Sequence, residues 1–371
     1  MFNNQFAVFM NFKYPKRLVV KIGSNVLTMD NGQPDISRME SLVKQMALLK
    51  QQKTQVILVS SGAVAFGRKD LSLPEKLDTV LKKQIWASAG QIELIQTYKK
   101  LFALEGIPIA QILVTKEDFR DRKHYLNMKN CLEGLISQNV LPIINENDTV
   151  AITELMFTDN DELASLTAAM VNADTLMLLT NVDGVFDGPP SDPESKLIPI
   201  INNKIPDLIH AISPVKSSFG RGGMLTKLSM AKKSADLGIQ VIIANGKKEN
   251  ILLNILKREA NFTFFEPRTS KHSPKKWLAH AEHYFKGEVI INEGAKNALF
   301  SDKISSLLPV GIKQMLGEFS KGDIIRIKDE HGIVLGLGKA EYSSLILQER
   351  LGQKNQKPFI HYDYLYLFQH D

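Results

Sequence analysis

Two groups of carboxylate and amide side chains lie near one another in the middle of the chain. The first is residues 145–148, of sequence Asn-Glu-Asn-Asp, and the second is residues 159–162, of sequence Asp-Asn-Asp-Glu. The second group has the pattern of a helix start, because Asp159 can cap and Glu162 can reach back to the cap amide. The first turn of a helix presents free N–H groups and a positive dipole end, which attract anions. The pattern therefore indicates a polar helix end that faces a cleft and an anionic ligand.

Two lysines occupy positions where a cation could meet such a ligand. Lys21 interrupts the apolar stretch 18–22. A lone buried ammonium is costly unless it is paired or faces a ligand, although a lysine at a strand end can also extend to solvent. Lys227 follows Gly222 and Gly223, whose backbone N–H groups could approach phosphate oxygens closely. An isolated helix lysine is more often a solvated surface residue, so the lysines alone leave both interpretations open.

Short apolar runs alternate with helical patterns, and these elements must position the polar groups. We expect strands at residues 18–22, 56–59, 107–114, 140–144, 176–179 and 239–244. Apolar residues at helical spacing predict helices at residues 37–50, 84–104 and 223–237. This alternation indicates an α/β fold with a mostly parallel sheet between helices, where ligands bind beyond the carboxyl ends of the strands. Four polar or glycine-containing segments follow those ends and predict one cleft: residues 21–24, 60–62, 145–148 and 180–181.

Composition divides the chain of 371 residues into two domains. We expect an N-terminal extension at residues 1–15 and an α/β domain at residues 16–262. A polar, basic segment broken by prolines follows at residues 263–285 and is typical of a linker. Short β runs punctuated by glycines then predict a small, mainly β domain at residues 286–371.

Charge and cysteine content narrow the class of protein. The chain has 46 basic and 40 acidic residues and a formal charge of +6, which suits anionic small molecules and does not require nucleic acid. Cys131 is the single cysteine, so neither a disulfide framework nor a thiolate metal cluster is expected. A reducing, cytoplasmic location follows as our expectation. No apolar run approaches the roughly 20 residues of a membrane span, so we expect no membrane partner.

Five ordered segments of the first domain resemble the amino-acid kinase family and, within it, the glutamate 5-kinases: residues 19–24, 60–65, 145–148, 159–161 and 222–227. The tail is similar to a PUA domain through residues 287–289, 293–295 and 305–311. The resemblance implies ATP-dependent phosphorylation of the γ-carboxylate of L-glutamate to γ-glutamyl phosphate, the first step of proline biosynthesis. It also implies a homo-oligomer, a tetramer or dimer, and feedback inhibition by proline in competition with glutamate.

The resemblance assigns catalysis to Lys21, Asp161 and Lys227, with the acid organising two lysines that neutralise the transferring phosphoryl group. It assigns glutamate binding to Ser61, Gly62, Ala63, Asp148 and Asn160. It assigns ATP binding to Lys21, Gly23, Thr180, Asn181, Arg221, Gly222, Gly223, Met224, Leu225, Thr226 and Lys227. Asn181 and Arg221 depart from the acid and threonine usual in the family, which disfavours a charged role at position 181 but keeps a hydrogen-bonding one, and Arg221 could add a phosphate contact or point to water. Without the resemblance, helix capping alone would explain Asp161.

The sequence lacks the phosphate-binding motifs of other kinase families, which is consistent with the implied chemistry. There is neither a G-x-x-x-x-G-K-[ST] loop nor the H-R-D and D-F-G pair of protein kinases. A carboxylate acceptor is already ionised, so the obstacle is repulsion between anions, which two lysines and a metal would reduce. Mg²⁺ would be held mainly by ATP phosphates and waters, and we expect no protein metal site.

Two alternatives stay open at this point. The same fold could phosphorylate a different acceptor: acetylglutamate, aspartate, carbamate or a nucleoside monophosphate. PUA domains commonly bind RNA, so the chain could instead act on RNA through its tail. The tail lacks the aromatic platform of an RRM, however, which disfavours an RNA partner.

Overall fold

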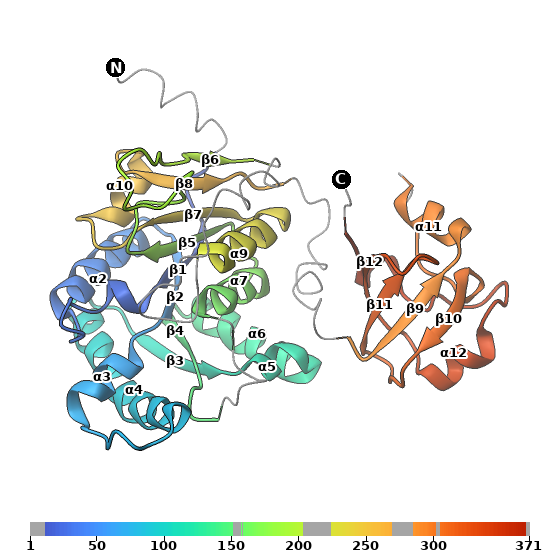
Figure 1. Cartoon of the computed structure of the whole chain (residues 1–371), viewed down its shortest axis with the longest axis horizontal. Coiled ribbons are helices and arrows are strands. Elements are labelled where there is room, and N and C mark those ends of the chain that lie inside the picture. The colour runs from blue at the N-terminus through green and yellow to red at the C-terminus, as the bar shows by residue number, and fades with distance from the viewer. Residues whose placement is uncertain are drawn as a thin grey trace. The chain divides into compact units, whose positions relative to one another are not determined.

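The computed structural model describes residues 12–150, 157, 159–202, 224–268, 285–301 and 305–368. The chain forms two compact units, Met1–Thr269 and Ser270–Asp371. Each unit has its own sheet (Figure 1). Each also has its own hydrophobic core. None of the described helices is both long and apolar enough to span a membrane.

The sheet of the first unit has eight strands in the order β3-β4-β2-β1-β5-β7-β8-β6. The neighbours from β3 to β7 pair in parallel, and β8 runs antiparallel to β7. The central strands are buried on both faces, as a sheet between two helical layers requires. The expected mostly parallel α/β sheet is confirmed. The strands are β1 Arg17–Ile22, β2 Gln55–Ser60, β3 Ile109–Val114, β4 Leu141–Glu146, β5 Thr175–Thr180, β6 Ile200–Ile201, β7 Gln240–Asn245 and β8 Phe262–Phe265.

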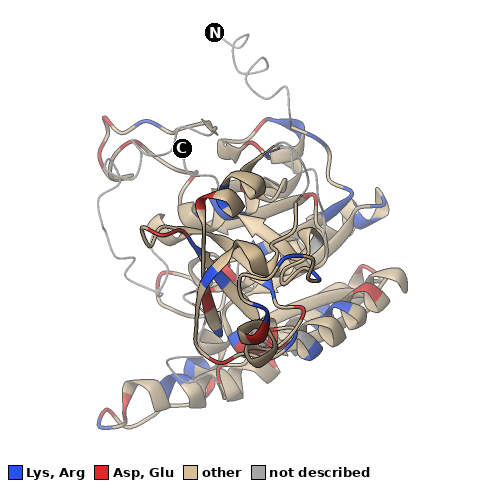
Figure 2. Ribbon diagram, turned by 90° about the vertical axis from the view of Figure 1, so that its right-hand side faces the viewer, with Lys and Arg blue, Asp and Glu red and all other residues tan. Residues whose placement is uncertain are grey.

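Helices cover both faces of this sheet (Figure 1). One layer is formed by α2 (Ile36–Gln51), α4 (Thr79–Leu104) and α10 (Ile251–Lys257). The opposite layer is formed by α6 (Arg122–Ser137), α7 (Asn160–Met170) and α9 (Met224–Asp236). The short helices α3 (Ala63–Asp70) and α5 (Lys116–Arg120) follow β2 and β3. Figure 2 shows basic and acidic residues interspersed along the helices rather than gathered in one stripe.

Helices α3 and α4 cross at two glycines, and this crossing positions one wall of the cleft that forms the candidate site. A Cβ atom at Gly67 would lie 1.9 Å from the carbonyl oxygen of Trp86. A Cβ atom at Gly90 would lie 1.9 Å from the carbonyl oxygen of Ala63. Both distances are far below any real contact, so only glycine allows the two backbones to approach this closely. The sequence pattern gave a turn where α3 begins and started the next helix at Gln84, whereas α4 begins at Thr79.

The boundaries of the first unit differ from those expected. β8 lies in the first sheet, so the linker expected from residue 263 starts too early. The Thr263 hydroxyl donates to the carbonyl of Ile198 at 2.7 Å and accepts from the amide of Val185 at 2.8 Å. Phe12 packs edge-on against Phe264, with ring centres 5.6 Å apart, so this residue of the expected extension belongs to the core of the first unit. β8 is short and aromatic, and its apolar residues show neither helical nor alternating spacing. The sequence pattern therefore did not predict a strand there.

The second unit is a small, mainly β domain, as expected. Its five strands have the order β10-β9-β11-β12-β13, with a parallel pair between β9 and β11 and antiparallel pairs elsewhere. Two short helices pack with this sheet around a separate core. The elements are β9 Gly287–Ile291, α11 Glu293–Phe300, β10 Ile312–Leu316, β11 Ile324–Lys328, β12 Val334–Lys339, α12 Ser344–Arg350 and β13 Leu365–Leu367.

Candidate active site

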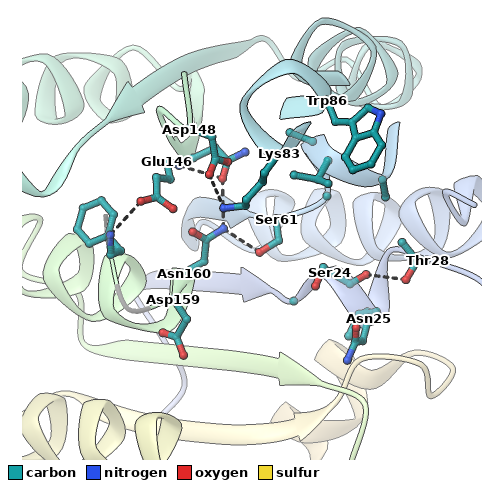
Figure 3. A pocket seen from close by; sticks show the side chains of 18 of the residues that line it. Ser24, Asn25, Thr28, Ser61, Lys83, Trp86, Glu146, Asp148, Asp159 and Asn160 are labelled. Carbon is teal, nitrogen blue, oxygen red and sulfur yellow. Dashed lines mark hydrogen bonds and ion pairs between the residues drawn. The ribbon is translucent and has the colours of Figure 1, made fainter. Parts of the chain in front are cut away.

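A cleft of about 940 Å³ opens beyond the carboxyl ends of the central strands of the first unit. Each of the four segments expected there contributes to its lining. Gly23 follows β1, Ser61 follows β2, Asp148 follows β4, and Thr180 ends β5. These strands are adjacent in the sheet, so their ends converge. Figure 3 shows the polar side chains of Ser61, Asp148, Asp159 and Asn160 around this space.

At one end of the cleft, a single carboxylate binds two ammonium groups. The Lys21 Nζ lies 2.6 Å from Asp161 Oδ1, and the Lys227 Nζ lies 2.9 Å from Asp161 Oδ2. Val20 and Ile22 pack in the core on the α2 side, so Lys21 between them points to the opposite face. Its partners come from α7 and α9, which lie on that face. The structure therefore brings together the three residues assigned to catalysis.

Burial and charge oppose each other at this triad. The Asp161 side chain is 0% exposed, and burial by itself raises the pKa of a carboxyl group. The ammonium groups of Lys21 and Lys227 outweigh that effect and hold the pKa of Asp161 at about 2. Burial lowers the pKa of Lys227, but the carboxylate of Asp161 raises it above its usual value overall. Asp161 and Lys227 are therefore both charged at neutral pH.

The pKa of Asp159, two residues earlier, is raised rather than lowered. Its Oδ1 caps α7 and accepts from the amides of Asp161 at 2.9 Å and Glu162 at 3.1 Å. Its Oδ2 is buried and has no hydrogen-bond partner among the described residues. Burial, together with repulsion from the Asp161 carboxylate, raises the pKa of Asp159 to about 6. This carboxyl group lines the cleft and titrates near neutral pH.

An amide network lies at the other end of the cleft (Figure 3). The Asn160 side chain donates to the Ser61 hydroxyl at 2.7 Å and to the Asn145 amide oxygen at 3.2 Å. Asn145 in turn donates to the side chain of Gln91 on α4 at 2.9 Å. Gly62 has a φ of 113°, which favours glycine and turns the chain from β2 into α3. The network links β2, β4, α4 and α7, so the polar atoms are held by several elements.

An ion pair that the sequence pattern did not suggest lies at the same end of the cleft as this network. The Lys83 Nζ is 2.7 Å from Asp148 Oδ1, and the side chains are 33% and 13% exposed. Lys83 was missed because it precedes the expected helix start at Gln84. The available signal was Asp78, whose carboxylate accepts from the amides of Val80 and Leu81 and caps α4.

Only some of the residues assigned to nucleotide binding line the cleft. Gly23, Thr180 and Lys227 line the cleft, whereas Asn181 is exposed and is not part of its lining. Three residues of the first turn of α9 also lie outside the lining: Met224, Leu225 and Thr226. Arg221, Gly222 and Gly223 lie outside the described residues.

No group of three or more His, Cys, Asp or Glu side chains within the described ranges is placed to hold a metal ion. Glu146, a buried carboxylate of the cleft, accepts from the amide of Phe157 at 2.9 Å. Lys116 also lines the cleft and binds Glu162 at 3.0 Å. These contacts give partners to two acidic side chains of the expected polar groups, Glu146 and Glu162.

Comparison with known proteins gives consistent matches. Residues 16–245 match the amino acid kinase family, and residues 287–359 match the PUA domain. A glutamate 5-kinase from Bacteroides thetaiotaomicron is 49% identical over 95% of this chain and 98% of its own length. A glutamate 5-kinase from Chlorobaculum tepidum is 48% identical over 96% of this chain and 99% of its own length. Among solved structures, UMP kinase from Ureaplasma parvum aligns with a TM-score of 0.49 at 17% identity, over 68% of this chain and 100% of that one.

Proposed function

We infer that this chain acts as its relatives do, because it belongs to the amino acid kinase family and, within that family, to the glutamate 5-kinases. It transfers the γ-phosphoryl group of ATP to the γ-carboxylate of L-glutamate. The product is γ-glutamyl phosphate, and the reaction is the first step of proline biosynthesis. One observation supports the proposed mechanism above all others: Asp161, fully buried, holds two ammonium groups at the end of the cleft.

In the proposed reaction, a γ-carboxylate oxygen of glutamate attacks the γ-phosphorus of ATP. The bond from that phosphorus to the β,γ-bridging oxygen breaks, and ADP leaves with the oxygen. The acceptor carboxylate is ionised at neutral pH, so no general base is required. The main obstacle is repulsion between the carboxylate and the triphosphate. Lys21 and Lys227 would reduce it, since preorganised ammonium groups stabilise the charge of the transition state.

We assign Asp161 to the positioning of these lysines rather than to proton transfer. Both of its oxygens contact an ammonium group, and its pKa of about 2 keeps it ionised. The carboxylate therefore fixes the separation of Lys21 and Lys227. It also offsets the cost of burying two ammonium groups, which is high for a lone lysine.

Glutamate is proposed to bind at the amide-rich end of the cleft. Asp148 would receive its α-ammonium group, and the side chains of Ser61 and Asn160 would bind its other polar atoms. Gly62 and Ala63 would add backbone N–H groups from the start of α3, where such groups face outward. All five residues line the same cleft.

ATP is proposed to bind beside the lysine pair, next to the ends of β1 and β5. A Cβ atom on Gly23 would lie in contact with the Lys21 Nζ, at 3.6 Å, so a side chain there would occupy space beside the ammonium group that is proposed to bind phosphate. Mg²⁺ would bind mainly to phosphate oxygens and water, as this small hard cation prefers. The remaining nucleotide contacts are proposed for Thr180, Asn181, Arg221, Gly222, Gly223, Met224, Leu225 and Thr226.

Three further properties are proposed from the family's pattern alone. The protein is expected to be a cytoplasmic homo-oligomer, a tetramer or dimer, and light scattering that gives a monomeric mass would contradict this. Proline is expected to inhibit in competition with glutamate. Initial rates at several fixed proline concentrations test this point, and rates that ignore millimolar proline would reject it.

Hydroxylamine trapping tests the reaction itself. Acyl phosphates react with hydroxylamine to give a hydroxamate, which forms a coloured complex with ferric iron, so the wild-type chain should form γ-glutamyl hydroxamate in step with ADP. The controls omit glutamate or replace it with aspartate or N-acetylglutamate, which separates this acceptor from those of other amino-acid kinases. Formation of ADP with no glutamate hydroxamate would overturn the proposed function.

A further inference from the structure

The ion pair between Lys83 and Asp148 points to a selectivity role for Lys83. We propose that Lys83 binds the α-carboxylate of the amino-acid acceptor, while Asp148 binds the α-ammonium group of the same molecule. The two side chains would thus recognise the zwitterionic head group as a unit. This inference rests on the proposed function, because it concerns the acceptor of that reaction.

The direction of the Lys83 side chain supports this assignment. In Figure 3, Lys83 extends from α4 toward Asp148, Asn160 and Ser61. Two other cations of α3 and α4 line the cleft, Arg68 and Lys82, and both have different partners. The Arg68 guanidinium lies 4.7 Å from the centre of the Trp86 ring, and the Lys82 Nζ donates to the backbone carbonyl of Glu75 at 2.6 Å. Lys83 is therefore the cation of this wall that faces the proposed acceptor site.

Lys83 and Asp148 also retain capacity for a ligand, unlike the triad at the other end. Asp161 is 0% exposed and contacts a different lysine through each oxygen. The Asp148 side chain is 13% exposed and has one lysine partner, and Lys83 is 33% exposed. An ammonium has three donors and a carboxylate about four acceptor sites, so each group can bind a ligand without losing the other.

Charge balance explains why a zwitterion would be preferred. The Lys83–Asp148 pair is neutral, and so is an α-amino acid head group. Each charge of the ligand then meets an opposite charge of the protein, and the local net charge stays zero. A ligand without the α-carboxylate would leave Lys83 partly desolvated and without a new partner. Failure to pair a desolvated charged group is costly, so such a ligand is rejected.

The position of Lys83 is fixed by the fold. The crossing at Gly67 and Gly90 holds α4 against α3, and Asp78 caps the first turn of α4. Helix α3 begins next to Ser61, which is part of the same cleft. The ammonium of Lys83 and the hydroxyl of Ser61 are therefore held by one packed unit, which is the preorganisation that a selective site needs.

The test compares two acceptors that differ only in the proposed contact. L-Glutamate and its α-amide both carry the γ-carboxylate and the α-ammonium, but the amide lacks the α-carboxylate charge. Hydroxamate formation gives kcat/KM for each acceptor. The wild-type enzyme should prefer glutamate by about 100-fold, and Lys83→Gln should reduce this preference by about 10- to 100-fold. Lys83→Arg should keep most of the preference, because it keeps the charge.

The outcomes separate selectivity from a purely structural role. If Lys83 only holds Asp148 in place, Lys83→Gln will lower kcat/KM for both acceptors by the same factor, and the inference is wrong. Unchanged kinetics would reject it as well. Lys100→Gln, the same change at an exposed position farther along α4, should alter neither acceptor. A wild-type enzyme that forms no glutamyl hydroxamate would instead reject the proposed function.

Discussion

Each end of the cleft contains a lysine ammonium bound to an aspartate carboxylate, and the contact distances are similar. The Lys21–Asp161 distance is 2.6 Å, and the Lys83–Asp148 distance is 2.7 Å. The surroundings differ, however. Asp161 is fully buried and binds a second lysine, Lys227, whereas Asp148 keeps part of its surface exposed. The same pair of groups thus forms a closed arrangement at one end and an open one at the other.

The comparison shows that the surroundings, rather than the contact itself, decide what an ion pair can do. A saturated, buried carboxylate cannot exchange its partners for a ligand, so it serves to fix the positions of two cations. A partly exposed pair such as Lys83–Asp148 can bind the charged groups of a ligand while Lys83 and Asp148 stay in contact with each other. Changes at the first end should therefore lower the rate of phosphoryl transfer, and changes at the second should lower affinity for the acceptor.

The largest effect is expected for Lys227→Ala at the closed end. Removing one ammonium should lower kcat about 1,000-fold or more, with a much smaller change in the KM for glutamate, because the contact is made chiefly in the transition state. Steady-state rates measure both constants. Lys232→Ala, on the same helix, is the matched control and should keep an ordinary kcat. A Lys227→Ala enzyme with wild-type kcat would remove this lysine from catalysis.

The second largest effect is expected for Asp148→Asn at the open end. Loss of the carboxylate should raise the KM for glutamate about 100-fold, while kcat should fall less than about 10-fold. The exposed Glu93 of α4 provides the control, and Glu93→Gln should leave both constants unchanged. A fall in kcat as large as that expected for Lys227→Ala would contradict the proposal that one end governs phosphoryl transfer and the other governs affinity for the acceptor.

The closed end could be predicted from the sequence to a considerable extent. Lys21 interrupts an apolar strand, and Asp161 lies in the first turn of a helix with a clear capping pattern. In a mostly parallel sheet, both positions must lie at the carboxyl ends of the strands. The resemblance added Lys227, which no local pattern distinguishes from a solvated helix lysine. Topology and the resemblance together were enough to place the triad.

The open end could not be predicted in the same way. Lys83 precedes the part of α4 whose apolar spacing is regular, and Val80 and Leu81 in that first turn are exposed. The contact with Asp148 depends on the crossing of α3 and α4 at Gly67 and Gly90. That crossing is a tertiary feature, and no local pattern in the sequence encodes it. The strand β8 was missed for a related reason, since only its neighbours in the sheet identify it.

A third prediction concerns Asp159, which lies next to the closed triad but is not saturated. Its pKa of about 6 lies above the ordinary 3.8, so the folded chain keeps a proton that the unfolded chain loses between these values. Stability should therefore fall as the pH rises from about 4 to about 6, by roughly 2 kcal/mol from this group. Asp159→Asn should abolish that loss, since asparagine caps a helix about as well.

Thermal unfolding of both proteins between pH 4 and 7 measures this difference. The Asp161 carboxyl acts in the opposite direction and at lower pH. Its pKa of about 2 lies below the ordinary value, so its contribution is already complete above about pH 4 and is lost only on acidification. Parallel curves for wild type and Asp159→Asn across this range would show that Asp159 is ionised throughout. The closed end would then contain two permanent negative charges.

The smallest effect is expected for an ion pair outside the cleft. The Lys44 Nζ lies 2.6 Å from Glu40 Oε1 on the exposed face of α2, as close as the Lys21–Asp161 contact. Lys44→Ala should nevertheless shift the unfolding midpoint by no more than about 1 °C and leave kcat and KM unchanged, because water and salt screen exposed pairs. A kinetic change from this variant would mean that total charge, rather than the position of each pair, governs the enzyme. The contrast between the two ends would then lose its physical basis.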